Sequence, residues 1–254
     1  MKIEIPQKLL ELKEPVKELY AMGDLNLLKR PCVAIVGSRK ALLYTKHATE
    51  KLSSMLSNAG VAVVSGGAAG VDAAAHRGAM PNTIAVLPTP LDILYPKINS
   101  ALLKEIANRG LLLSEYAESA PISKYNFVLR NRIVTALSSA LVIAQADLKS
   151  GSLRSAEYAL KCGVPIYVFP HRIGESEGTA QLVKNGQAVV IEDLGEFVKM
   201  FAPNSANEEI KDDLLVFCAK NTDLNDCLKK FGDKIYEYEL SGKIAISNMR
   251  VKVL

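Results

Sequence analysis

The chain has 254 residues, of which 49% are hydrophobic, so it can bury the core of one large domain or of a large and a small one. The net charge of +4 is mild, and the four cysteines match neither a zinc spacing nor a disulfide scaffold. The first residues contain no apolar signal-peptide core, and no stretch approaches the ~18 apolar residues of a membrane helix. We therefore expect a cytoplasmic protein without a membrane association.

Short apolar runs rich in β-branched residues recur along the first two hundred residues, and each ends in a turn or a polar cluster. They cover 33–36, 61–64, 83–87, 111–113, 140–144, 165–169 and 188–191. Continuous apolar runs of this length are typical of strands buried on both faces of a parallel sheet. Segments with helical spacing lie between them, at 46–59, 131–139 and 152–161. The alternation predicts an α/β fold with a doubly wound, mostly parallel sheet.

The pattern changes at 202–207, a polar stretch that contains a proline and suits a linker. We predict a first domain over 1–204, with 1–30 as an N-terminal extension, and a second over 205–254. Helices are expected at 209–219, 223–231 and 233–241, followed by a hairpin of 244–246 with 251–254. Three helices and a hairpin are the outline of a winged helix. This second domain carries 8 Lys/Arg against 9 Asp/Glu, so the positive charge lies in the first domain.

Two glycine-containing turns follow the first two strands of the predicted sheet. The first is Gly37-Ser38-Arg39, and the second is the stretch SGGAAGVD at 65–72. Ligands of doubly wound sheets bind at the carboxyl ends of the strands, where helix N-termini favour phosphate groups. Arg39 adds a full positive charge there. The spacing is not the dinucleotide pattern GxGxxG, and glycines at such turns also serve packing alone, so both interpretations stay open.

A third basic element surrounds the strand at 140–144. The window 124–154 holds Lys124, Arg130, Arg132, Lys149 and Arg154 against Asp147 alone, and Ser150 and Ser152 follow the same strand. Binders of single-stranded nucleic acid combine a positive groove with aromatic side chains on which bases stack. Phe127 lies among these cations and is the candidate platform, with ordinary core packing as the alternative.

The motifs together resemble one family over nearly the whole chain. In order they are LYAMGD (19–24), VAIVGSR (33–39), SGGAAGVD (65–72), AAH (74–76), LSEY (113–116), Phe127 with RNR (130–132), and KSGS (149–152). They are similar to the DNA-processing protein A (DprA/Smf) family. The resemblance implies an extended Rossmann-like core that binds single-stranded DNA without a nucleotide cofactor. It also implies a homodimer that interacts with RecA and loads it onto incoming DNA in natural transformation.

The same resemblance implies a DNA-binding site at particular residues of this chain. These are Arg39, Gly66, Gly67, Lys124, Asn126, Phe127, Arg130, Lys149, Ser150 and, at the end of a helix, Lys161. Two features depart from the family. Residues 178–180 read GTA where an asparagine is expected, and the C-terminal domain is net negative. For that domain, contact with a protein is at least as well supported as binding of double-stranded DNA.

An enzyme of related fold is the main alternative. Nucleotide phosphoribohydrolases share the early glycines, but they rely on a PGGxGT loop closely followed by a glutamate. Here the comparable loop lacks the paired glycines, and Arg154 and Ser155 stand where a carboxylate is wanted, with Glu157 further along. Glycosidic cleavage needs such a carboxylate. We therefore predict a binding protein with no catalytic activity, cofactor or metal. A purely structural adaptor is a third possibility.

The three histidines do not change this interpretation. They are far apart, and no cysteine or acid accompanies them at a motif spacing. We predict that His76, after an alanine-rich helix start, is packed in the core. His171 follows a proline at a strand end and is expected to face the ligand crevice.

Overall fold

The computed structural model describes residues 1–202 and 213–253. The chain divides into two compact units, Met1–Pro203 and Asn204–Leu254. The larger unit is built on one sheet, for which nine strands are described, in the order β1-β2-β6-β5-β4-β3-β7-β8-β9. Their bounds are β1 Lys2–Ile3, β2 Leu19–Gly23, β3 Cys32–Val36, β4 Ala62–Ser65, β5 Thr83–Leu87, β6 Leu111–Ser114, β7 Ala140–Ile143, β8 Ile166–Val168 and β9 Val189–Val190.

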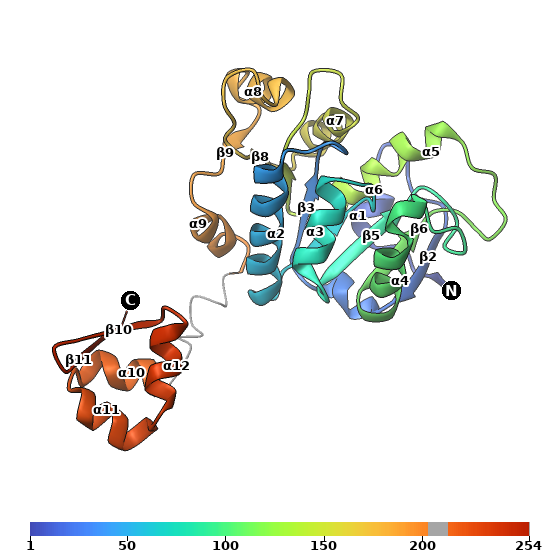
Figure 1. The fold of residues 1–254 in the computed structure, drawn as a ribbon. Coiled ribbons are helices and arrows are strands. Elements are labelled where there is room, and N and C mark those ends of the chain that lie inside the picture. Colours follow the sequence, from blue (N-terminus) through green and yellow to red (C-terminus); the bar gives the residue numbers. More distant parts are fainter. Residues whose placement is uncertain (203–212, 254) are drawn as a thin grey trace. The chain divides into compact units, whose positions relative to one another are not determined.

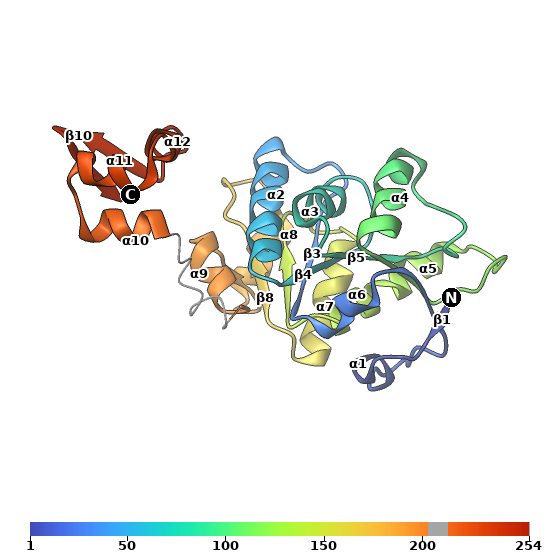
Figure 2. The same ribbon diagram turned by 90° about the horizontal axis from the view of Figure 1, so that it is seen from below.

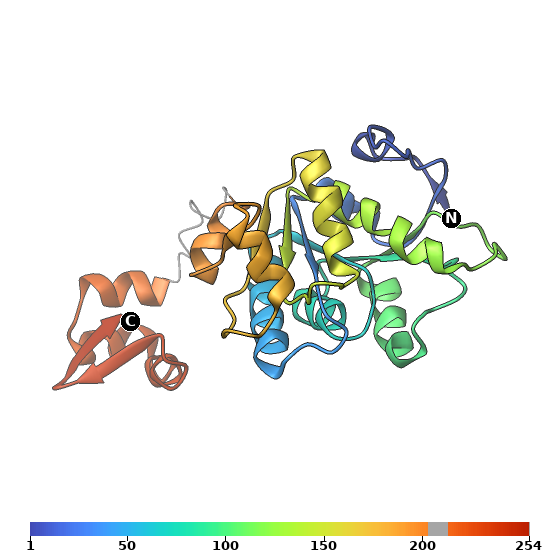
Figure 3. The same cartoon turned by 90° about the horizontal axis from the view of Figure 1, so that it is seen from above.

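Helices cover both faces of this sheet (Figures 1 and 2). They are α1 Gln7–Leu10, η1 Leu25–Lys29, α2 Leu43–Asn58, α3 Val71–Ala79, η2 Lys97–Asn99, α4 Ser100–Arg109, α5 Lys124–Leu129, α6 Asn131–Ala136, α7 Ser152–Cys162, α8 Glu177–Lys184 and α9 Leu194–Lys199. In Figures 2 and 3, α2, α3 and α4 lie on one side of the sheet, and α1, α6 and α7 on the other. The architecture is therefore three-layered, as predicted.

The core follows from the period-two geometry of the strands. Val33 and Ile35 of β3 point to one face and pack in the cluster that includes Leu52 of α2. Ala34 points to the opposite face and packs in the cluster that includes Ile133 of α6. Because successive side chains of a strand alternate between faces, a strand covered on both sides must be apolar throughout. This explains why the continuous apolar runs marked the strands so well.

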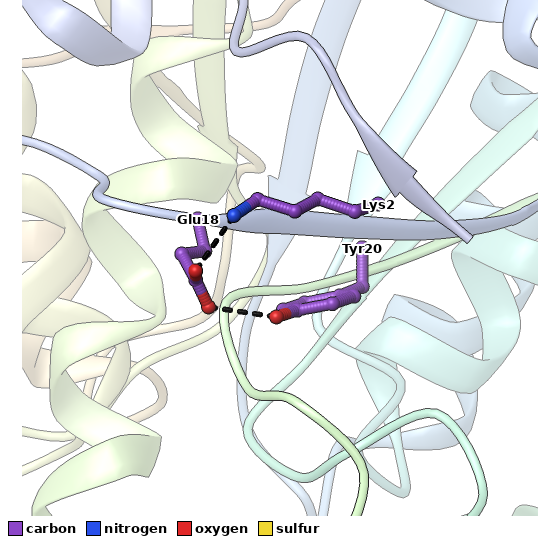
Figure 4. Close-up of polar contacts among 3 residues, drawn as sticks. All are labelled: Lys2, Glu18 and Tyr20. Atoms are coloured by element: carbon purple, nitrogen blue, oxygen red, sulfur yellow. Dashed lines mark hydrogen bonds and ion pairs between the residues drawn. The ribbon is translucent and has the colours of Figure 1, made fainter.

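The seven strands predicted from the sequence are confirmed, each within one residue at either end. The pairs from β6 through β9 are parallel, whereas β2 pairs antiparallel with β6 and β1 antiparallel with β2. Neither β1 nor β2 was predicted. Figure 4 shows how side chains join them: Glu18 accepts hydrogen bonds from Lys2 Nζ and Tyr20 Oη, both at 2.7 Å. The extension predicted over 1–30 thus completes one edge of the sheet.

The smaller unit has the predicted order of elements. Its helices are α10 Asp213–Lys220, α11 Leu224–Phe231 and α12 Lys234–Leu240, and β10 Ile244–Ser247 pairs antiparallel with β11 Arg250–Val253. Leu214, Cys218, Cys227, Ile235 and Val251 are among its core residues. The predicted domain boundary between residues 204 and 205, most of the predicted linker at 202–207 and the start of the predicted helix at 209–219 lie outside the described residues. Among the helices that are described, none combines the length and apolar character needed to cross a membrane.

Candidate nucleic-acid interface

The turns after β3, β4 and β7 interlock at the carboxyl edge of the sheet. The Ser38 amide donates to the carbonyl oxygen of Gln145 at 2.8 Å, and the Val71 amide donates to the carbonyl oxygen of Ser38 at 3.2 Å. Gly70 adopts φ +81°, and a Cβ there would collide with the backbone of Ser38 and Arg39. Only glycine permits both this dihedral angle and this approach of two backbones. The three crossovers therefore form one rigid edge from which α3 and α7 begin.

Arg130 occupies the centre of this edge as an internal brace. Its side chain is buried, and its Nη1 donates to the carbonyl oxygens of Gly66 and Val86, the latter at 2.6 Å. Burial lowers the pKa of the Arg130 guanidinium, and the nearby Asp72 carboxylate opposes that shift. A Cβ on Gly66 would overlap the guanidinium, so glycine is required beneath it. Arg130 was predicted to bind phosphate, but the structure commits its Nη1 to backbone carbonyls.

Two carboxylates, Asp72 and Asp147, line the same edge. Asp72 is buried in the first turn of α3, where its Oδ2 accepts a hydrogen bond from the Ala68 amide at 3.3 Å. Burial raises the pKa of Asp72, and the neighbouring Arg130 opposes the rise. Asp147, after β7, is exposed. Asp72 therefore holds the glycine turn and partly balances Arg130, while Asp147 lies open to solvent.

These turns enclose a groove of about 550 Å³ on the surface of the larger unit. We call it the carboxyl-edge groove. Arg39 and Lys40 lie on the β3 side, and Phe127, Val128 and Asn131 come from α5 and α6. Ser150, Gly151 and Ser152 close it at the start of α7, as the loop after β7 was predicted to do. A helix N-terminus that opens into a groove beside two cations suits an anionic ligand.

An aromatic pocket of about 80 Å³ adjoins the carboxyl-edge groove and shares Arg39, Gly66, Ala68, Phe127 and Arg130 with it. The rings of Phe127 and Tyr95 meet edge to face, with centroids 5.4 Å apart. Pro88 and Pro96 complete the apolar wall, and Tyr95 is 45% exposed. Phe127 was predicted as a platform; its partner Tyr95 was not. The sequence offered one indication of Tyr95. It lies in the loop that follows β5, and β5 is a strand that also ends at this edge.

The positive charge around the groove is free of acidic partners. Arg39, Lys40, Lys124 and Lys149 are exposed, and none takes part in the ion pairs found among residues 1–202 and 213–253. Lys97, which follows Pro96 of the aromatic pocket in the chain, is exposed as well. Surface cations outside ion pairs attract an anionic partner, and here they outnumber Asp72 and Asp147, the two acids that line the groove. The groove is thus fitted for a phosphate-bearing chain that also carries planar groups.

Comparisons with known proteins agree with this geometry. Residues 2–202 match the model of the family described as DNA recombination-mediator protein A. The chain belongs to this family. It is 39% identical over 190 residues to the DNA processing protein DprA of Streptococcus pneumoniae, covering 73% of this chain and 67% of that protein. It is 37% identical over 197 residues to protein Smf of Synechocystis, covering 74% of this chain and 50% of that protein.

Solved structures of family members share the fold. The chain is 43% identical to DNA processing protein A of Helicobacter pylori, with a TM-score of 0.78 over 80% of this chain and 96% of the other. That structure concerns the single-stranded DNA binding mode of the H. pylori protein. The S. pneumoniae DprA structure is 36% identical, with a TM-score of 0.74 over 79% of this chain and 74% of the other. Family membership and the α/β fold predicted from the sequence are therefore confirmed.

Asn126 and Lys161, both expected at this family's DNA-binding site, have other positions, and so does Arg132 of the basic segment. Asn126 is buried and accepts a hydrogen bond from Ser123 Oγ at 2.6 Å, so it holds the start of α5. Arg132, on the same basic segment as Arg130, is buried against Glu115 at 2.5 Å. Lys161 lines a separate depression with Lys8 and Lys13. It follows Ser152 by nine residues of α7, which at about 1.5 Å per residue places it roughly 13 Å from the groove.

The histidines behave as structural residues. His76 is fully buried, with Nδ1 2.7 Å from Thr83 Oγ1, as the prediction of a packed residue required. His171 Nε2 lies 3.1 Å from Thr45 Oγ1, and Thr45 Oγ1 donates to Gln145 Oε1 at the carboxyl edge. No cluster of three or more His, Cys, Asp or Glu suited to a metal occurs in the part of the chain that is described.

Burial makes His76 a source of acid sensitivity. It lowers the pKa of His76 from 6.5 to about 3, so between these values the unfolded chain binds a proton that the folded chain does not. Stability from this residue is present above about pH 6.5 and falls by about 1.4 kcal/mol per pH unit below it. We expect urea unfolding between pH 7 and 5 to show this slope, and His76→Gln to have a slope smaller by about that amount. Equal slopes would refute the assignment.

Proposed function

We propose that this protein binds single-stranded DNA in the carboxyl-edge groove and acts as a recombination mediator. In this proposal it is a homodimer that loads RecA onto incoming DNA during natural transformation. The observation that carries the DNA-binding role is the combination of unpaired Arg39 and Lys40 with the Tyr95–Phe127 pair at one end of the same groove. The RecA and dimer roles are supported by family membership.

The size of the aromatic pocket favours a single strand over a duplex. A cavity of about 80 Å³ lined by two rings and two prolines accepts an unstacked planar group, not a stacked base pair. Bases in a duplex are stacked on each other and are not free to enter. Stacking on an aromatic ring is also tolerant of sequence, because every base has a π-face. We therefore expect binding that depends on strandedness and salt more than on base sequence.

The groove residues have distinct roles in this mechanism. Arg39 and Lys40 neutralise phosphates, and the positive end of α7 favours a further phosphate, to which the Ser150 hydroxyl donates a hydrogen bond. Phe127 and Tyr95 hold a base. Arg130 and Asp72 fix the Gly66–Gly70 turn so that the backbone is shaped before the strand arrives, which reduces the ordering cost of binding.

The hydrolase alternative has one new observation in its favour, since Asp72 and Asp147 line the groove. Cleavage of a glycosidic bond needs a carboxylate free to reach the sugar. Asp72 is buried and hydrogen-bonded within its own turn, so of the two acids that line the groove only Asp147 is free, whereas glycoside hydrolysis uses a pair of carboxyl groups. We therefore propose that the protein has no hydrolase activity, so that nucleoside monophosphates remain uncleaved in an assay for free base.

Filter binding tests the proposed DNA-binding role directly. Wild-type protein should retain a single-stranded oligonucleotide more strongly than its duplex, and affinity should fall as salt rises because bound counterions are released. Arg39→Ala should weaken single-strand binding and reduce the salt slope by about 0.7, the share of one phosphate contact on a single strand. Arg154, paired with Glu157 on α7, offers a matched control as Arg154→Ala. Equal retention of both DNA forms, or equal effects of the two variants, would contradict the proposal.

A further inference from the structure

The carboxyl edge of the sheet continues beyond the groove, past β7 to β8 and β9. Tyr44, in the first turn of α2, is 53% exposed there and meets the His171 ring edge to face at 6.2 Å. Gln145 Oε1 accepts hydrogen bonds from the Leu42 amide at 2.9 Å and from Thr45 Oγ1 at 3.1 Å. The ring of Tyr44 is thus held at a fixed place by contacts that join the ends of β7 and β8 to α2.

A second depression of about 370 Å³ lies beside this ring. Tyr44, His47 and Lys51 line it from one face of α2, and Pro170 lines it from the loop after β8. We call these four residues the β8 shelf. Tyr44, His47 and Lys51 share a face of α2 because residues three, four and seven positions apart lie above one another.

The charge of the β8 shelf is favourable to an anion. Lys51 is exposed and takes part in no ion pair found among the described residues. Glu50, its neighbour on α2, is bound by Arg77 at 3.2 Å. Glu192 is the acid that lines this depression. An aromatic face beside an unpaired cation repeats, on a smaller scale, the composition of the carboxyl-edge groove.

The position of the shelf links it to that groove. Arg39 and Lys40 line the groove, and the chain then runs through Leu42 to Tyr44 within five residues. In the sheet, β4, β3, β7 and β8 are successive neighbours. At about 4.8 Å per neighbour, the ends of β4 and β8 are roughly 15 Å apart, a distance that a few nucleotides can span.

We infer that the β8 shelf is a second binding site for the same single strand, where Tyr44 stacks a base and Lys51 neutralises a phosphate. The inference rests on the proposed DNA-binding role of the groove and adds the path that the strand takes across the surface. The strand enters at the Tyr95–Phe127 pocket, crosses the groove past Arg39 and leaves over α2.

The inference is tested by comparing two oligothymidylates, of about 4 and about 12 nucleotides, both within the range known for single-strand sites. The short one fits the groove alone, and the long one reaches the shelf. Fluorescence anisotropy with the full chain should show that Tyr44→Ala weakens binding of the long oligonucleotide at least about five-fold and leaves the short one within about two-fold. Tyr44→Phe should restore the long-strand affinity, since it keeps the ring.

A charge variant gives an independent readout. Lys51→Ala should reduce the salt slope for the long oligonucleotide by about 0.7 and leave that for the short one unchanged. Lys104→Ala is the matched control, because Lys104 is an exposed lysine on α4 outside both depressions. It should change neither slope.

The outcomes separate the two proposals. If the wild type binds neither oligonucleotide, the proposed function fails and the shelf fails with it. If Arg39→Ala weakens both lengths while Tyr44→Ala and Lys51→Ala change neither, the groove stands and the shelf is overturned. Equal losses for both lengths in Tyr44→Ala also overturn it, because they indicate a disturbed groove. Loss confined to the long strand, with rescue by Tyr44→Phe, supports it.

Discussion

Replacing Arg130 with methionine is expected to destabilise the larger unit by about 3–5 kcal/mol. The guanidinium is buried, and its loss leaves the Gly66 and Val86 carbonyls without a donor and the Asp72 carboxylate without its cation. Breaking one partner of a buried network costs far more than the network contributes as a whole, because the remaining groups stay desolvated. For a unit of this size, the melting temperature should fall by roughly 6–20 °C.

Arg39→Met is the matched control for this experiment. Arg39 is exposed and takes part in no ion pair in the described parts of the chain, so its removal should change stability by about 0.5 kcal/mol or less. Thermal unfolding followed by circular dichroism compares the two variants directly. An Arg130→Met protein as stable as Arg39→Met would show that Arg130 is not a structural brace. Its role would then be phosphate binding alone.

Phe127→Ala should weaken binding of single-stranded DNA by about 1–3 kcal/mol, or about 5- to 150-fold, because the ring forms one wall of the aromatic pocket. Tyr95→Ala should act in the same direction. The two rings contact each other, so the double variant should lose less than the sum of the single losses. Anisotropy titrations at one fixed salt concentration measure all three affinities.

Tyr125→Ala controls for the general effect of removing a ring from α5. Tyr125 is 62% exposed on the same helix and lines neither the groove nor the aromatic pocket. Its loss should leave affinity unchanged within about two-fold. If Phe127→Ala binds as tightly as Tyr125→Ala, base stacking in this pocket is contradicted even if the groove still attracts DNA by charge.

The fold was largely predictable because a sheet covered on both faces imposes a simple pattern. Strands such as β3 and β7 must be apolar at every position, and the sequence shows this directly. The strand β2, between β1 and β6, escaped prediction since only part of it is buried, with Met22 and Gly23 exposed. Its pairing with β6 also brings together residues about ninety positions apart, and nothing in the local sequence reports such a contact.

The site was predictable at the level of its turns and less so at the level of individual side chains. Charge and spacing placed Arg39, Phe127 and Ser150 correctly at the groove. They could not show that Arg130, besides lining the groove, also braces a turn through hydrogen bonds to backbone carbonyls. Tyr95 was missed because its contact with Phe127 joins two loops across the edge. The distance of Lys161 from the groove could have been anticipated, since the rise of a helix separates it from Ser152.

Photocrosslinking shows directly whether single-stranded DNA lies in the carboxyl-edge groove. Single-stranded DNA containing 4-thiothymidine can be irradiated with the full chain, and the labelled peptides identified by mass spectrometry. We expect crosslinks in the peptides that contain Tyr95 and Phe127. Added salt and the Arg39→Ala substitution should each reduce this labelling. Crosslinks confined to the smaller unit, or to the depression around Lys8 and Lys161 with the carboxyl-edge groove unlabelled, would contradict it.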